Sequence, residues 1–177
     1  VVLGVTGEVG LHLTGSFWVV VLGLATYAWG RRLGEWPVAA AIIVVTSPLV
    51  VAGQNLMIDI PMLALASSSV AMYLRACEKN SVGTAVAAGM LAGLAVNFKY
   101  AGVVAIVVII IDSVLWRRWR MLAAGVIGLV LFAAGQLASM AIYGEPQILH
   151  ARNWIQRLWP SDVSDVLHRT STAVVYL

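Results

Sequence analysis

The feature that most restricts the fold of this chain is the alternation of long apolar stretches with short clusters of basic residues. Six such stretches lie at about residues 16–29, 38–57, 60–74, 82–98, 101–116 and 121–143. Backbone N–H and C=O groups find no water in the hydrocarbon core of a membrane, so a spanning segment pairs them internally, as an α-helix does. The pattern therefore predicts an all-α fold, a polytopic transmembrane helical bundle with one transmembrane helix for each stretch.

The composition excludes several other classes of protein. Of 177 residues, 61% are hydrophobic and only 11% are charged, whereas a soluble domain has about 25% charged residues. A disordered chain is excluded by the same figures. The net charge of +3 comes from basic residues that lie between the apolar stretches and do not line one face. We therefore expect membrane lipids, and no nucleic acid, as partners.

Two of the apolar stretches fall clearly short of a membrane span, which needs about 20 residues, with a range of about 17–25. The stretch at 16–29 can be extended back toward Leu11, but the stretch at 60–74 lies between Asp59 and Arg75. We expect this second stretch to depend on side chains that snorkel to the interface, on local thinning of the bilayer, or on a partly buried end.

The basic residues predict the orientation of the chain in the membrane. Cytoplasmic loops carry an excess of Lys and Arg, and strict alternation of the spans places seven basic residues in loops on one side and only Lys99 in a short loop on the other. The seven are Arg31, Arg32, Arg75, Lys79, Arg117, Arg118 and Arg120. We predict a multi-pass protein of the plasma (inner) membrane, with the loops that contain Arg31, Arg75 and Arg117 in the cytoplasm.

The chain reads as a single transmembrane domain over residues 1–177. The helical bundle covers 1–143, and residues 144–177, which are more polar, form an extracytoplasmic tail. Small residues at Gly89 and Gly93, and at Gly125 and Gly128, predict helices that approach closely. The chain begins without Met and lacks a signal peptide, so we expect an internal piece of a longer polypeptide.

Asp59 and Lys99 are the candidate functional residues, and each has a structural alternative. Asp59 comes two residues before Pro61, which is typical of a helix start; an ionisable group near the membrane boundary also fits a watery cavity. Lys99 lies in the predicted outer turn between two apolar stretches, where it suits an interfacial anchor. Asp112, on the inner side, is expected to pair with a nearby arginine or with Arg75.

Evidence for a metal site or for soluble cofactor chemistry is sparse. Glu8 and His150 lie on the predicted outer face and could contribute to a divalent metal site, but the chain has no HxxxH or HExxH spacing. It also has no Walker loop, GxSxG or CxxC motif, and the single Cys77 cannot form an internal disulfide. We therefore expect no cofactor other than a divalent metal ion.

Three stretches, taken in order, resemble one family of membrane enzymes. Residues 4–34 end in Gly-Arg-Arg-Leu-Gly, residues 46–63 run from Thr-Ser-Pro to Asp-Ile-Pro-Met-Leu, and residues 89–100 contain Gly-Leu-Ala-Val-Asn-Phe-Lys-Tyr. This order is similar to that of the GT-C glycosyltransferases, in the branch of dolichyl-phosphate-mannose protein mannosyltransferase-like proteins that includes aminoarabinose transferase. The family has Thr before its lysine, where this chain has Phe98.

The resemblance implies a sugar donor linked to a polyprenyl phosphate and a catalytic cavity on the outer face. It implies transfer with inversion of configuration at the sugar. Asp59 would be the acid of the second outer loop, which shapes the cavity or helps to hold a metal, and Lys99 would lie near the lipid phosphate. The loop that carries the catalytic base would precede Val1, so this piece alone is not expected to be active.

Two other function classes remain open from the sequence. In a transporter or flippase, Asp59 and Lys99 would line a substrate path, although both lie at predicted helix ends and no inverted repeat is visible. In a non-catalytic membrane scaffold, the small-residue helix faces would be the main functional feature.

Overall fold

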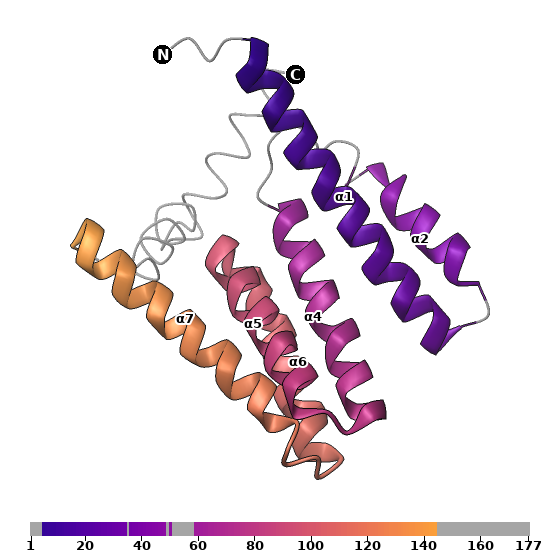
Figure 1. Ribbon diagram of the computed structural model, residues 1–177, viewed down its shortest axis with the longest axis vertical. Coiled ribbons are helices and arrows are strands. Elements are labelled where there is room, and N and C mark those ends of the chain that lie inside the picture. Colours follow the sequence, from indigo (N-terminus) through magenta and orange to yellow (C-terminus); the bar gives the residue numbers. More distant parts are fainter. Residues whose placement is uncertain (1–4, 35, 49, 51–58, 145–177) are drawn as a thin grey trace, which may run out of the picture. The chain divides into compact units, whose positions relative to one another are not determined.

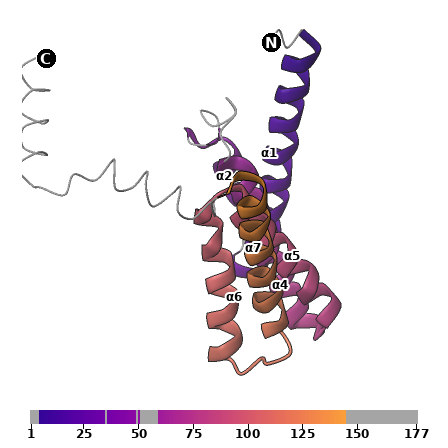
Figure 2. The same ribbon diagram turned by 90° about the vertical axis from the view of Figure 1, so that its left-hand side faces the viewer.

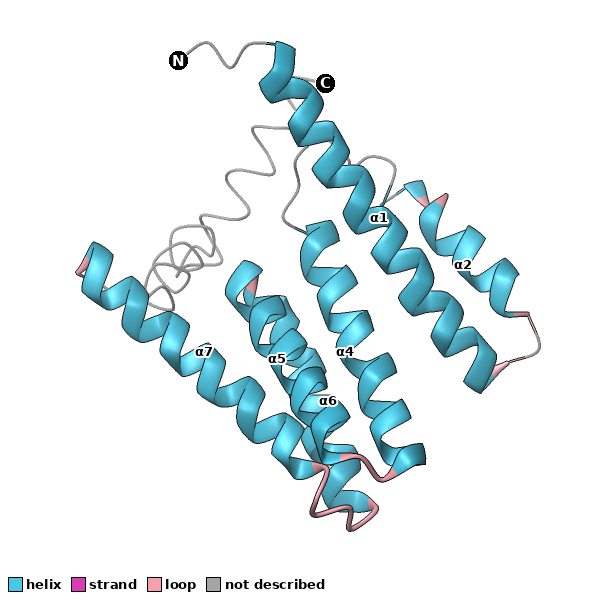
Figure 3. Cartoon of the chain, viewed as in Figure 1, coloured by secondary structure: helices cyan, strands magenta, loops and turns pink. Residues whose placement is uncertain are grey.

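The computed structural model describes residues 5–34, 36–48, 50 and 59–144, and all regular secondary structure in these residues is helical (Figure 3). The elements, labelled in Figure 1, are α1 (Val5–Leu33), α2 (Pro37–Val45), α4 (Asp59–Lys79), α5 (Val82–Phe98), the 3-10 turn η1 (Tyr100–Gly102), α6 (Val103–Leu115) and α7 (Leu122–Tyr143). The all-α prediction is confirmed.

Three helical segments in this described part are long and apolar enough to cross a membrane. They are His12–Arg32, Asp59–Lys79 and Leu122–Tyr143, and two shorter apolar helices, Val82–Phe98 and Tyr100–Leu115, accompany them. The chain is therefore an integral membrane protein with several membrane helices.

The helix that contains the short apolar stretch 60–74 extends beyond it at its C-terminal end. Helix α4 has 21 residues, and at a rise of 1.5 Å per residue it is about 31 Å long, which matches the hydrocarbon core. The helix continues through Arg75 and Lys79, because a long charged side chain does not interrupt the backbone hydrogen bonds and can extend to water. Arg75 is indeed exposed.

The sequence predicts one helix over the stretch at 38–57, and this prediction was wrong, because the helix is interrupted after Val45. Helix α2 ends at Val45, the Thr46 amide donates to the Ile42 carbonyl (2.9 Å), and helical conformation resumes at Pro48. Pro48 has no N–H for the Val44 carbonyl, and its ring disfavours helical conformation at Ser47. Residues 51–58 lie outside the described residues.

The chain divides into two compact units, Val1–Phe132 and Ala133–Leu177, with the boundary inside α7. In the first unit α4 packs against α1, α5 and α6 (Figures 1 and 2). Its core contains Tyr73, Ile106 and Ile109, which are at most 1% exposed. The second unit begins with the last turns of α7, and its residues 145–177, the predicted tail, lie outside the described residues.

Glycines allow α5 and the first half of α7 to approach closely, as the sequence predicts. A Cβ atom on Gly89 would collide with the carbonyl oxygen of Ala124, and one on Gly93 would lie 2.6 Å from the Cβ of Leu131. The Asn97 side-chain amide donates to the Gly93 and Leu131 carbonyls (3.0 and 3.2 Å), which joins the same two helices.

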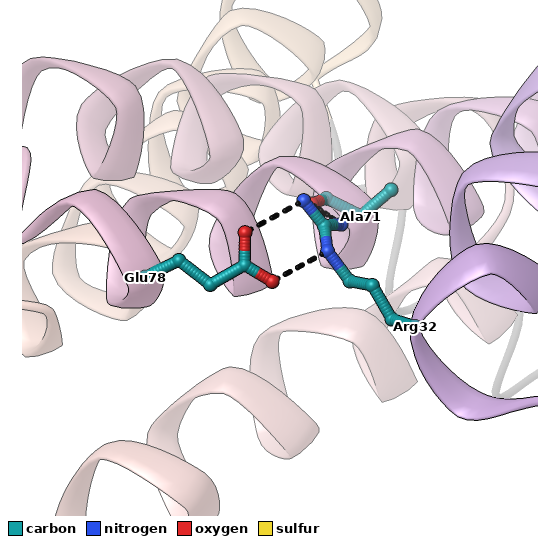
Figure 4. Close-up of polar contacts among 3 residues, drawn as sticks. All are labelled: Arg32, Ala71 and Glu78. Atoms are coloured by element: carbon teal, nitrogen blue, oxygen red, sulfur yellow. Dashed lines mark hydrogen bonds and ion pairs between the residues drawn. The ribbon is translucent and has the colours of Figure 1, made fainter.

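The basic segments meet at one end of the first unit. Arg32, at the end of α1, donates to the Glu78 carboxylate through Nε (2.8 Å) and to the Ala71 carbonyl through Nη1 (2.8 Å), both on α4 (Figure 4). Arg118, in the loop after α6, pairs with Asp112 (3.4 Å), whose carboxylate also accepts from Tyr73 on α4. The ends of α1, α4 and α6 therefore adjoin there. We call this part the basic end.

Candidate functional site

Asp59 is the first residue of α4, and Pro61 lies in the first turn of this helix, as the sequence predicts. The residues that follow fix its position. Ile60 is 3% exposed and packs with Val19 and Leu22 of α1, while Met62 packs with Ala95 of α5. Asp59 is thus held at a helix start between α1 and α5. A negative charge there is stabilised by the helix dipole.

Lys99 lies in the turn between α5 and η1, and its backbone is extended (φ −157°, ψ 138°). Its amide donates to the Ala95 carbonyl (3.1 Å), and its own carbonyl accepts from the Gly102 amide (2.9 Å). Gly102 lies so close to α5 that a Cβ atom on it would be 2.6 Å from the carbonyl carbon of Ala95. The backbone that carries Lys99 is therefore held tightly against the last turn of α5.

The structure brings these two candidates together, although 40 positions separate them in the sequence. Lys99 Nζ forms an ion pair with Asp59 Oδ1. The side chains are 50% and 36% exposed, so both remain accessible. Lys99 is therefore a partner of Asp59.

This ion pair lies at the end of α4 opposite the basic end. Asp59 begins α4, whereas Glu78 lies in its last turn, and the helix between them is about 30 Å long. An exposed carboxylate can accept a proton or bind a sugar hydroxyl, and an ammonium group can bind a phosphate. Their juxtaposition therefore places a proton acceptor beside a phosphate-binding group.

The described residues do not supply a complete ligand set for a metal at this place. No group of three His, Cys, Asp or Glu side chains gathers among them, and the neighbour of Asp59 is a cationic lysine. Glu8 lies in α1, but its side chain is not among those described, and His150 lies outside the described residues. We therefore assign no step to a metal ion.

Asp112 forms the pairing expected of it, with Arg118 as the partner rather than Arg75. Asp112 also has a second partner, Tyr73, which was not predicted from the sequence. Tyr73 is 1% exposed, donates to Asp112 Oδ2 (2.7 Å) and lies 2.8 Å from Ser113 Oγ. A tyrosine within an apolar helix was the available signal, because a buried hydroxyl needs a partner. These contacts hold α4 to α6, which is a structural role.

Comparison with known proteins identifies the family. No curated protein and no solved structure matches the chain significantly. The family model described as dolichyl-phosphate-mannose-protein mannosyltransferase matches residues 2–142, which include α1 to α6, nearly all of α7, and both Asp59 and Lys99. This match covers most of the 177 residues and agrees with the resemblance in the sequence. The chain therefore belongs to the dolichyl-phosphate-mannose-protein mannosyltransferase family, of the GT-C type.

Proposed function

We propose that this chain is the membrane core of an enzyme that transfers a sugar from a polyprenyl-phosphate donor to an acceptor outside the cytoplasm. The observation that carries the proposal is the Asp59–Lys99 pair, at the end of α4 opposite the basic end. Membership of the family supports the reaction class. The pair supports the place, because the reaction needs a carboxylate near the sugar and positive charge at the phosphate.

The proposed reaction is a single displacement at the anomeric carbon. The acceptor oxygen gives its proton to the carboxylate of the first outer loop that the family resemblance implies, and it bonds to this carbon. The bond from the carbon to the phosphate oxygen breaks, and the lipid phosphate leaves with the electron pair. Attack from the face opposite the phosphate inverts the configuration. Asp59 binds and orients the sugar and the acceptor through their hydroxyl groups, and Lys99 stabilises the negative charge on the leaving phosphate.

Lys99→Ala tests the phosphate role. A hydrogen bond to a charged group contributes about 1.5–3 kcal/mol, so we expect the KM for the polyprenyl-phosphate sugar to rise roughly 10- to 100-fold. Lys99→Arg keeps the charge and retains most of the affinity. The measurement is transfer kinetics of the full-length enzyme in nanodiscs.

Lys79→Ala is the matched control, because Lys79 is an exposed lysine at the other end of α4. An unchanged KM in Lys99→Ala would contradict the assignment. If the protein moves the lipid-linked sugar across liposomes without transferring it, the chain is a flippase and the proposed function fails.

We also propose that the basic end faces the cytoplasm and the Asp59–Lys99 pair faces outward, because seven basic residues lie near the ends of α1 and α4 and in the loop after α6. In a Cys77→Ser background, Ala101→Cys, an exposed position two residues after Lys99, is expected to react with an impermeant maleimide on intact cells. Trp119→Cys, at the exposed basic end, is expected to react only after permeabilisation. The reverse pattern would overturn the orientation.

A further inference from the structure

An open pocket of about 290 Å³ lies at the basic end, away from the Asp59–Lys99 pair. Its lining includes Cys77 and Asn80 at the end of α4, and Arg117, Arg118, Trp119 and Arg120 in the loop between α6 and α7. The volume is roughly ten times that of one water molecule. The pocket therefore has room for a polyatomic group.

The charge of the pocket is mostly uncompensated. Asp112 pairs with Arg118 (3.4 Å), and Cys77 together with Asp112 raises the pKa of the Arg118 guanidinium above its ordinary value. Within the described part of the chain, no carboxylate pairs with Arg117 or Arg120. Two cationic side chains thus line a pocket without a negative partner, which favours an anionic ligand.

The backbone at Arg117 adopts a defined turn at the pocket. Its φ is +52°, in the left-handed region, and the Arg118 amide donates to the Ser113 carbonyl (2.8 Å) while the Arg117 amide donates to Val114 (3.1 Å). These two bonds form a Schellman motif, in which glycine is the usual residue at the left-handed position. The chain has an arginine there instead, and its side chain lines the pocket.

The position of the pocket indicates the source of the anion. The loop joins α6 to the membrane-spanning helix α7, and it carries Trp116 and Trp119, which are 66% and 64% exposed. Exposed tryptophans beside arginines are typical of the membrane–water interface. The anions concentrated at this level of a membrane are phospholipid phosphates.

We propose that this pocket binds the phosphate of an anionic phospholipid headgroup, with Arg117 and Arg120 as its charge partners. A guanidinium group can donate two parallel hydrogen bonds to phosphate oxygens, which suits arginine to this role. Trp119 lines the same pocket and packs against the apolar part of the lipid next to the headgroup. The site lies apart from the Asp59–Lys99 pair and does not depend on the proposed transfer reaction.

Arg117→Gly and Arg120→Gln test this site in the full-length, delipidated protein. Glycine suits the left-handed turn, so the first variant removes the guanidinium and keeps the backbone. We expect the apparent Kd for phosphatidylglycerol, measured by native mass spectrometry, to rise about fivefold in each variant. Arg75→Gln is the matched control, because Arg75 is exposed on α4 and does not line the pocket; its Kd is expected to equal that of the wild type.

Two further ligands distinguish the source of the anion. Phosphatidylcholine, which has no net charge, is expected to bind weakly and equally to all variants. Inorganic phosphate is expected not to displace phosphatidylglycerol at equal concentration. Wild-type affinity for phosphatidylglycerol in both arginine variants, equal binding of phosphatidylcholine, or displacement by inorganic phosphate would overturn the proposal.

Discussion

Asp59→Asn is expected to lower kcat for sugar transfer by about a hundredfold or more in the full-length enzyme. The carboxamide keeps the shape of the side chain but loses the negative charge that binds and orients the hydroxyl groups of the sugar and acceptor. Stability should hardly change, because an ion pair between side chains that are 50% and 36% exposed contributes about 1 kcal/mol or less. The loss of activity would therefore not result from unfolding. Transfer kinetics and thermal denaturation of the same preparation measure both effects.

Two further variants separate a functional Asp59 from a structural one. Glu78→Gln breaks the ion pair with Arg32 at the basic end, so it removes a comparable contact and should leave kcat unchanged. The double substitution Asp59→Lys with Lys99→Asp restores an ion pair with the charges exchanged. We expect this double variant to fold and to stay inactive. Recovery of kcat would show that the pair only holds α4 to the turn after α5.

Gly89→Ala is expected to destabilise the protein by about 1–3 kcal/mol, the usual cost of inserting a methyl group into a filled contact. Its Cβ would collide with the carbonyl oxygen of Ala124 in α7. Backbone cannot give way as the end of a flexible side chain can, so α5 and the first half of α7 would have to separate. The effect opposes helix propensity, which favours alanine over glycine by about 1 kcal/mol.

Gly83→Ala, in the same helix, is the matched control for this prediction. A Cβ atom there would meet no atom within 4 Å, so the substitution should be neutral or stabilising. The free energy of unfolding in mixed detergent micelles measures both variants. If Gly89→Ala proves as stable as Gly83→Ala, the close contact of α5 with α7 is not present in the folded protein.

The sequence predicted the ends of a helix correctly only where the capping residues and the limits of the apolar stretch coincide. Helix α5 runs over Val82–Phe98, as the apolar stretch predicts, because Ser81 caps its start and Lys99 adopts extended backbone at its end. The Ser47–Pro48 pair is a start signal inside an apolar stretch, and hydropathy alone does not reveal it. At Arg75 the error was the opposite one. The charged residue suggested that the helix ends there, but α4 continues to Lys79.

The sequence alone determined that this is an all-α membrane protein. Hydrophobic residues make up 61% of the chain and occur in long stretches, and in hydrocarbon such stretches must pair their backbone groups internally. It also singled out Asp59 and Lys99. Only the tertiary structure decided that these two side chains form a pair, and that Arg117 and Arg120 line one pocket with the end of α4. Such contacts depend on how closely α4, α5 and α6 approach one another. Side chains that are far apart in the sequence set this approach, so the periodicity of the sequence does not predict it.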